Sequence, residues 1–428
     1  MNEEYFASVI GYDEVKNELS RILDTLIHPE KYEAFGVRPP KNLLLYGDVG
    51  LGKSLMAKCF IKATGRKTYI VRKNKSDGKL VDEISNVFES ASHQPSVILL
   101  DDLDRFANED EKRCDTEEYL AVQSGIDAFG ENSNVFVVAT CNRIEKLPGS
   151  LIRPGRFDIT IEVKKPRGET SKKIVEYYLR DKKVSPYLNL DDISRALEGC
   201  SCAELETCLN DAGIEAAFHN KAFIEKEEMT NSILKYVCEV FPEKTPKDPE
   251  KLERIAIHEA SHAAMAEILN PGSVSLASTA LDSEKNEGVV SVDYYGKGYS
   301  AECYENEILV ALSGKAGVEL RFGTADPGSS GDMRRALRSV DRLVDDFTSY
   351  GLNQFEYARE HSPAFYEKKE SSVFVEAERY YAKAKRILHD NYGFVTAIAD
   401  ALMKNGTLYH SDIETIRKEY EKNKASCA

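Results

Sequence analysis

Long apolar runs are missing from this sequence of 428 residues. A transmembrane helix needs about 20 consecutive apolar residues, and no stretch of the chain approaches that length. The first residues also lack the basic start and the apolar run of a secretory signal. We therefore expect a protein that is neither secreted nor membrane-spanning, that has no membrane anchor of its own, and that is located in the cytoplasm.

The sequence also lacks an excess of positive charge and the regular cysteine spacing of a disulfide-bonded protein. The chain has 57 Lys and Arg against 72 Asp and Glu, a net charge of −15, which argues against a nucleic-acid-binding surface. The nine cysteines are odd in number and scattered, a distribution that favours reduced thiols over disulfides. Cys200, Cys202 and Cys208 lie close together but lack the paired spacing of a zinc knuckle.

The first half of the chain predicts an α/β domain followed by helices. Short apolar runs alternate with helical periods over residues 1–165, which is typical of a mostly parallel sheet flanked by helices. Residues 166–240 have helical periods with few β-branched runs. We expect them to form a small helical lid on the α/β domain.

The second half predicts a separate, mainly helical domain. Prolines and charges gather between residues 241 and 250, a composition typical of an interdomain linker. Helical periods dominate residues 251–428, apart from a small hairpin that apolar alternation predicts at residues 274–281 and 289–295.

A phosphate-binding loop follows the first strong strand, residues 42–46. The strand runs into G-x-x-x-x-G-K-S and then into a helix, which is the P-loop pattern in its confirming context and not a Gly-rich turn without function. Backbone N–H groups would surround the phosphates, Lys53 would reach the β- and γ-oxygens, and Ser54 would offer its hydroxyl to Mg²⁺. The predicted nucleotide site comprises Gly47, Asp48, Val49, Gly50, Leu51, Gly52, Lys53, Ser54 and Leu55.

Two further apolar strands, residues 97–100 and 135–140, end in polar side chains. Asp101 and Asp102 follow the first of them. Because carboxylates at the end of a buried strand are costly unless they face a cation, we expect Asp101 to face Mg²⁺ and Asp102 to orient the attacking water. Asn142 follows the second strand and would position the same water.

A Pro-Gly turn carries two arginines, Arg153 and Arg156. Arginines held in this way can reach the γ-phosphate bound to a neighbouring subunit. The alternative that such a short stretch leaves open is a pair of solvated surface arginines.

A metal-binding pattern lies in the second half, on a helix expected over residues 250–269. His258 and His262 are four residues apart and therefore share a helix face, so both can offer an imidazole nitrogen to one metal ion. Glu259 is placed to take a proton from a water held by that metal. The alternative is an amphipathic helix with two solvated or core histidines. Catalytic zinc needs a third protein ligand, for which the residues alone leave open many acids and His361, His389 and His410.

On these motifs the chain resembles the FtsH-type AAA zinc metalloproteases, which are ring-forming ATPases fused to a zinc protease. The order of P-loop, paired carboxylates, asparagine and two arginines is specific to AAA ATPases. Residues 9–16 are similar to a family segment in which the backbone at Ile10 and Gly11 would meet adenine. Residues 125–129 resemble the family's intersubunit signalling element, with Ala128 where glycine is usual.

The resemblance also implies a third ligand and an assembly. Residues 311–323 are similar to the segment before the family's third ligand, and residues 328–333 match the loop that supplies an aspartate. Asp332 is the implied ligand, although Gly-Asp before a helical run is by itself more typical of a helix N-cap. The implied cofactors are Zn²⁺, ATP and Mg²⁺, and the implied assembly is a homohexamer that acts on protein substrates.

Three features depart from the family. The transmembrane anchor is missing, which predicts a soluble relative or one tethered by a partner. Asp102 stands where the family has glutamate and is one methylene shorter, which predicts slow hydrolysis. Residues 72–79 are shorter than the family's pore loop and lack its aromatic residue, so they would hold a threaded chain poorly, although their cations could attract an acidic one.

The sequence therefore predicts an ATP-dependent zinc endopeptidase. One alternative is an AAA remodeller or assembly factor whose zinc site is structural or weakly active. Another is a peptidase that is not coupled to ATP-driven unfolding.

Overall fold

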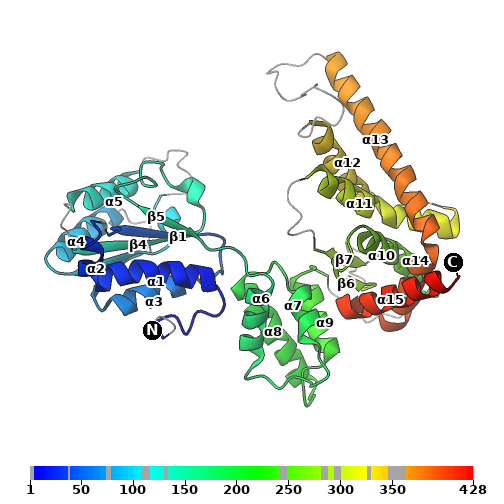
Figure 1. Ribbon diagram of the computed structural model, residues 1–428, viewed down its shortest axis with the longest axis horizontal. Coiled ribbons are helices and arrows are strands. Elements are labelled where there is room, and N and C mark those ends of the chain that lie inside the picture. Colours follow the sequence, from blue (N-terminus) through cyan, green and yellow to red (C-terminus); the bar gives the residue numbers. More distant parts are fainter. Residues whose placement is uncertain are drawn as a thin grey trace. The chain divides into compact units, whose positions relative to one another are not determined.

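The chain folds into two packing units, which Figure 1 shows as ribbons. The computed structural model describes residues 4–36, 39–73, 79–107, 116–129, 134–240, 248–280, 288–293, 300–324, 329–345 and 363–427. One unit consists of Met1–Lys182 with Gly199–Leu209, and the other of Lys183–Glu198 with Asn210–Ala428.

A five-stranded parallel sheet forms the centre of the first unit, with strand order β2-β3-β4-β1-β5. Its strands are β1 (Asn42–Tyr46), β2 (Lys67–Val71), β3 (Ser96–Leu100), β4 (Val135–Cys141) and β5 (Ile159–Glu162). Every residue of β3 and β4 is buried, as expected for parallel strands covered on both faces. The α/β fold predicted from the alternating pattern is confirmed.

The longer helices of this unit bury apolar residues against the sheet or against one another. In α1, for example, Leu19, Ile22 and Leu23 are buried, at the spacing of an amphipathic helix. The helical elements are α1 (Asp13–Ile27), α2 (Pro29–Glu33), α3 (Lys53–Thr64), α4 (Leu80–Ser92), η1 (Leu103–Arg105), α5 (Glu117–Ala128), η2 (Ile144–Lys146) and α6 (Glu169–Leu179).

The strand order places the polar residues of three strands at one edge of the sheet. From β1 the chain crosses to β2 and β3 and returns through β4, which pairs with β1. Ligands of open α/β sheets bind at the carboxyl ends of the strands where the order reverses. The residues after β1, β3 and β4 meet at this point.

The lid helices after the sheet are α6, α7 (Leu190–Ala196), α8 (Cys202–Phe218) and α9 (Lys226–Tyr236). Ser201 begins α8 with a reciprocal cap: its Oγ accepts from Glu204 N at 3.3 Å, and its own N donates to Glu204 Oε2 at 2.6 Å. The two packing units divide the expected lid, so the domain boundaries at residues 165, 240 and 250 stay a prediction. Most of the expected linker, residues 241–247, lies outside the described residues.

The second unit is mainly helical with a small antiparallel sheet. Besides α7, α9 and the second part of α8, its helices are α10 (Pro249–Leu269), α11 (Ala301–Phe322), α12 (Ser330–Asp345), α13 (Pro363–Asp390), α14 (Tyr392–Asn405) and α15 (His410–Cys427). The expected hairpin is present as β6 (Val274–Ser278) and β7 (Val289–Val292). A third strand, β8 (Thr407–Tyr409), pairs with β6 and was not predicted, because three residues are too few to show a period.

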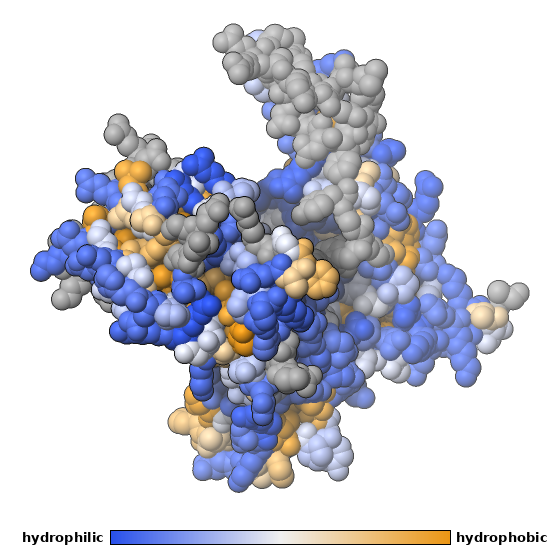
Figure 2. All heavy atoms as spheres, turned by 60° about the vertical axis from the view of Figure 1, so that its left-hand side comes forward, coloured by the Kyte–Doolittle hydropathy of each residue, from blue (hydrophilic) through white to orange (hydrophobic). Residues whose placement is uncertain are grey.

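Side chains of α10, α11, α12, α13 and α14 share one hydrophobic core. Figure 2 shows that much of the visible surface is hydrophilic and that hydrophobic residues gather over the lid helices and over part of the first unit. Ile214 and Phe218 of α8 are 60% and 81% exposed.

Candidate metal centre and nucleotide site

Helix α10 carries the first two candidate ligands. Pro249 occupies its first turn and Asp248 caps it, accepting a hydrogen bond from Glu250 N at 3.3 Å. The helix runs without interruption to Leu269. His258 and His262 therefore lie one turn apart on the face that packs on α11.

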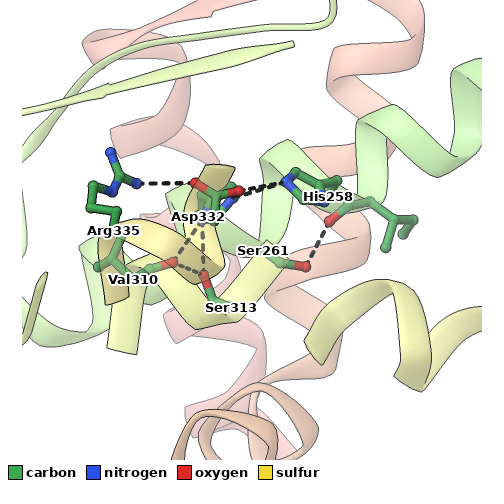
Figure 3. Close-up of polar contacts among 8 residues, drawn as sticks. His258, Ser261, Val310, Ser313, Asp332 and Arg335 are labelled. Carbon is green, nitrogen blue, oxygen red and sulfur yellow. Dashed lines mark hydrogen bonds and ion pairs between the residues drawn. The ribbon is translucent and has the colours of Figure 1, made fainter. Parts of the chain in front are cut away.

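Three ligand atoms converge at this face, as Figure 3 shows. His262 Nε2 lies 3.0 Å from His258 Nε2. Asp332 Oδ2 lies 3.2 Å from His258 Nε2 and 3.3 Å from His262 Nε2. Ligands about 2.0–2.1 Å from a tetrahedral zinc ion are separated by about 3.3 Å. The triangle thus has the size and the donor chemistry of a zinc site, and among the described residues it is the cluster that fits a metal.

Glycines of α11 create the space for this triangle. A Cβ added at Gly314 would lie 2.4 Å from His262 Nε2 and 2.6 Å from His258 Nε2. One at Gly317 would lie 1.8 Å from Ser261 Oγ. Only residues without a side chain allow α11 to approach α10 this closely.

The ring of His262 is held by α11. Its Nδ1 lies 2.6 Å from the carbonyl oxygen of Val310 and 3.2 Å from Ser313 Oγ, and Ser313 in turn donates to the same carbonyl at 2.6 Å. A proton on Nδ1 shared with the Val310 carbonyl leaves the lone pair of Nε2 directed at the metal position.

Asp332, in the first turn of α12, brings the negative charge. Burial by itself would raise its pKa, but interaction with the imidazoles of His258 and His262 holds that pKa well below the usual range. Arg335, one turn further along, places Nη2 3.3 Å from Asp332 Oδ1. Oδ2 faces the histidines while Oδ1 is held by this arginine (Figure 3).

Glu259 lies beside the triangle and is 6% exposed. Burial raises its pKa to about 7, although the charge of His258 lowers it. A Cβ at Gly288, next to β7, would lie 2.3 Å from Glu259 Oε1. The carboxyl group is therefore enclosed between the metal position and the edge of the small sheet.

The histidines that the residues alone left open as third ligands lie elsewhere. His389 is exposed, with Nδ1 3.3 Å from Asp390 Oδ1. His410 Nδ1 lies 3.1 Å from the carbonyl oxygen of Val274. His361 lies outside the described residues.

The P-loop in the first unit wraps around its own lysine. Gly47, Gly50 and Gly52 have φ values of 141°, 81° and 84°, which only glycine adopts without strain. Lys53 is 5% exposed, and burial lowers its pKa. Its Nζ donates to the carbonyls of Gly47 and Asp48 at 2.7 Å and 2.6 Å. Of the other loop residues, Leu51 is buried and Val49 and Leu55 are exposed.

Oxygen donors for a hard cation gather around Asp101. Asp101 Oδ1 accepts from Ser54 Oγ at 2.9 Å and from Thr140 Oγ1 at 2.7 Å. Hydroxyl and carboxylate oxygens are what Mg²⁺ prefers, and this pair is the one that P-loop ATPases use. The residues fit the cofactor that the sequence predicted.

Asp102 and Asn142 are linked to Lys53 by hydrogen bonds. Asn142 accepts from Lys53 Nζ at 2.8 Å and donates to Asp102 Oδ1 at 3.3 Å. Asp102 has a left-handed backbone, with φ 57° and ψ 52°, a conformation that Asp adopts more readily than most residues with a side chain. The structure brings together the residues expected to surround the γ-phosphate.

Arg153 and Arg156 differ in their exposure to solvent and in their hydrogen bonds. Arg153 is exposed. Arg156 is bound within its own chain, donating to both oxygens of Asp127 at 3.0 Å and 2.7 Å and to Gln123 Oε1 at 2.9 Å. Its predicted reach into a neighbouring subunit requires these bonds to break.

Ile10 and Gly11 line a pocket of about 760 Å³ with side chains of α1 and α6. Gly11 lies against the first turn of α6, where a Cβ would be 2.7 Å from Thr170 Cγ2. Their contact with adenine stays a prediction. Most of the expected pore loop, residues 74–78, lies outside the described residues.

Comparison with known proteins places both halves of the chain. Residues 43–165 match the family model described as "ATPase family associated with various cellular activities (AAA)". The ATP-dependent zinc metalloprotease FtsH 2 of Thermoanaerobacter sp. (strain X514) is 29% identical over 97% of this chain and 83% of its own length. The chain is similar over nearly its whole length to ATP-dependent zinc metalloproteases named FtsH.

Other FtsH proteins align with different shares of their length. The ATP-dependent zinc metalloprotease FtsH of Aquifex aeolicus (strain VF5) is 30% identical over 79% of this chain, which spans 56% of that relative. FtsH 2 of Symbiobacterium thermophilum is 27% identical over 96% of this chain and 74% of its own length. Among the described helices, none is long and apolar enough to cross a membrane.

Several residues of the site are not predicted by the sequence motifs. The carbonyl of Val310 and the hydroxyl of Ser313 cannot be linked to His262 without the packing of α11. Gly314 and Gly317 did carry a signal, since two glycines three residues apart in an apolar helix indicate close approach of another element. Arg335 gave no signal beyond its position one turn after Asp332.

Proposed function

We propose that this protein is an ATP-dependent zinc endopeptidase. The observation that supports it best is the triangle of His258, His262 and Asp332 with the buried carboxyl of Glu259 beside it. Two nitrogens and one oxygen leave a tetrahedral metal with one open position, which is the arrangement of catalytic zinc and not of structural zinc.

Glu259 is the general base and then the general acid of the proposed reaction. Zinc in this site supplies Lewis acidity, which polarises the scissile carbonyl and lowers the pKa of water. The Glu259 carboxylate takes a proton from the attacking water and returns it to the leaving amine. A pKa raised to about 7 suits both transfers near neutral pH.

The edge strand β7 is the proposed guide for the polypeptide. The small sheet of the described residues has the strand order β7-β6-β8. In it, β7 pairs with β6 and is an edge strand. Extended peptides bind to such edges by main-chain hydrogen bonds. Gly288 places the start of this strand against Glu259, so a bound chain would pass the catalytic carboxyl.

Nucleotide turnover is assigned to the first unit. Lys53 and the loop backbone would hold the phosphates, Ser54 and Asp101 the cation, and Asp102 with Asn142 the attacking water. The proposed assembly is a homohexamer in which exposed Arg153, and Arg156 once released from Asp127, would approach nucleotide on the next subunit. A cytoplasmic location stays a prediction of the sequence.

Casein degradation by the purified chain tests the proposal. We expect Glu259→Gln to abolish cleavage while zinc content and ATPase rate stay near wild type, because the amide cannot accept the proton. Glu250→Gln, an exposed position on the same helix, serves as the matched control and should cleave normally. Unchanged cleavage by Glu259→Gln would refute the assignment.

The same assay separates the alternatives. Zinc-loaded protein with ATPase but without peptidase activity would indicate a remodeller with a structural zinc site. Cleavage that a chelator stops but that Lys53→Ala leaves unchanged would indicate a peptidase independent of ATP.

A further inference from the structure

Arg72 lies at the cation position of the nucleotide site and not on a substrate-gripping loop. The sequence alone predicts that it belongs to a pore loop, residues 72–79. Its Nη2 donates to Asp101 Oδ2 at 2.5 Å and lies 3.9 Å from Asp102 Oδ2. A guanidinium group therefore sits between the two carboxylates expected to serve the cation and the attacking water.

The register of the sheet explains this position. Strands β2 and β3 pair in parallel with Val71 opposite Leu100, and Asp101 N donates to the carbonyl of Val71 at 3.0 Å. The next residue of each strand, Arg72 and Asp101, must then also lie side by side. Backbone pairing therefore places Arg72 within side-chain reach of Asp101.

Both oxygens of Asp101 are engaged in this arrangement. Oδ1 accepts from Ser54 and Thr140, and Oδ2 accepts from Arg72. Mg²⁺ requires oxygen ligands at about 2.0–2.1 Å in a rigid octahedron. A divalent cation coordinated by Ser54 and Asp101 would lie close to the positive charge of Arg72. The electrostatic repulsion between them would be strongly unfavourable.

We propose that Arg72 is an internal counter-ion that competes with Mg²⁺ for Asp101. In the absence of nucleotide it neutralises the buried carboxylate, which would otherwise be costly. When Mg²⁺ enters with nucleotide, the side chain, which is 49% exposed, swings to solvent. Arg72 is thus a positioning residue that sets the Mg²⁺ concentration at which the site fills. The inference rests on the nucleotide site proposed above.

Binding of a fluorescent N-methylanthraniloyl ADP to the full chain, titrated with Mg²⁺ from an EDTA baseline, tests this proposal without reference to proteolysis. Removing the competing charge in Arg72→Gln should lower the half-saturating Mg²⁺ concentration by about 5- to 10-fold, the scale of a partly exposed charge-assisted pair. Arg72→Ser should do the same, and Arg72→Lys should stay close to wild type because it keeps the charge.

Lys73→Gln is the matched control. It removes the same charge at the next position, where Nζ donates to the Phe106 carbonyl at 2.8 Å, and should leave the Mg²⁺ requirement unchanged. An equal or higher requirement in both Arg72→Gln and Arg72→Ser, or an equal shift in Lys73→Gln, would overturn the proposal. Absence of nucleotide binding by wild type under every condition would refute the nucleotide site, and this inference with it.

Discussion

The glycine at position 314 is expected to decide whether the protein holds its metal. A methyl group at Gly314 would lie 2.4 Å from His262 Nε2 and 2.6 Å from His258 Nε2. These separations are close to the about 2.0–2.1 Å at which zinc binds a histidine nitrogen. The substituted methyl would therefore collide with both imidazole rings and displace the two ligand nitrogens.

The magnitude follows from the contacts. Disturbing the support of one ligand typically costs about 10- to 100-fold in metal affinity. Gly314→Ala affects both histidines at once, so we expect a loss of at least about 100-fold, or about 2.7 kcal/mol. Overpacking costs about 1–3 kcal/mol of folding stability, which the better helix propensity of alanine offsets by about 1 kcal/mol. The variant should stay folded.

Equilibrium dialysis against buffered zinc, with the bound metal measured by atomic absorption, gives the affinity. Thermal unfolding in a chelator measures the stability of the metal-free protein separately. Gly331→Ala is the control, because a Cβ there meets nothing within 4 Å although the position adjoins the third ligand. Zinc binding by Gly314→Ala with wild-type affinity would refute the reasoning.

Two further predictions concern the same unit. Ser313→Ala removes the hydroxyl near His262 Nδ1 and should therefore lower zinc affinity by up to about tenfold. The same dialysis measures this change. A loss of zinc affinity larger than that of Gly314→Ala would contradict the reasoning, because Ser313 contacts only one of the two histidine ligands. Glu319 is a pH probe: burial alone would raise its pKa, but Lys315 and its other hydrogen-bond partners lower it to about 2. Its contribution, about 1–2 kcal/mol, is present above pH 4.5 and is lost as the pH falls toward 2. Chemical unfolding should show that Glu319→Gln reduces this loss in the acid range, and an unchanged pH profile would contradict the assignment.

Local patterns in the sequence were sufficient to predict most residues of the nucleotide site. The P-loop lies within a continuous stretch, and the carboxylates and Asn142 each follow an apolar strand, so their positions depend mainly on parallel strand order. Hydrogen bonds that run through Asp102 and Thr140 connect Lys53, Ser54, Asp101 and Asn142 in one network, as the strand–loop–helix pattern indicated. The same holds for His258 and His262, whose common face follows from the helix period alone.

Contacts between distant segments were decided only by the tertiary structure. Asp332 lies 74 residues from His258, and no local pattern distinguishes a metal ligand from a helix cap at that position. The support of His262 by Val310 depends on two glycines that allow α11 to approach α10. The sequence predicts Arg72 in a substrate-gripping loop, whereas the register of β2 against β3 places it beside Asp101. Helix and strand periods specify which face a residue occupies, whereas the partner on that face is set by packing between elements that the chain brings together only on folding.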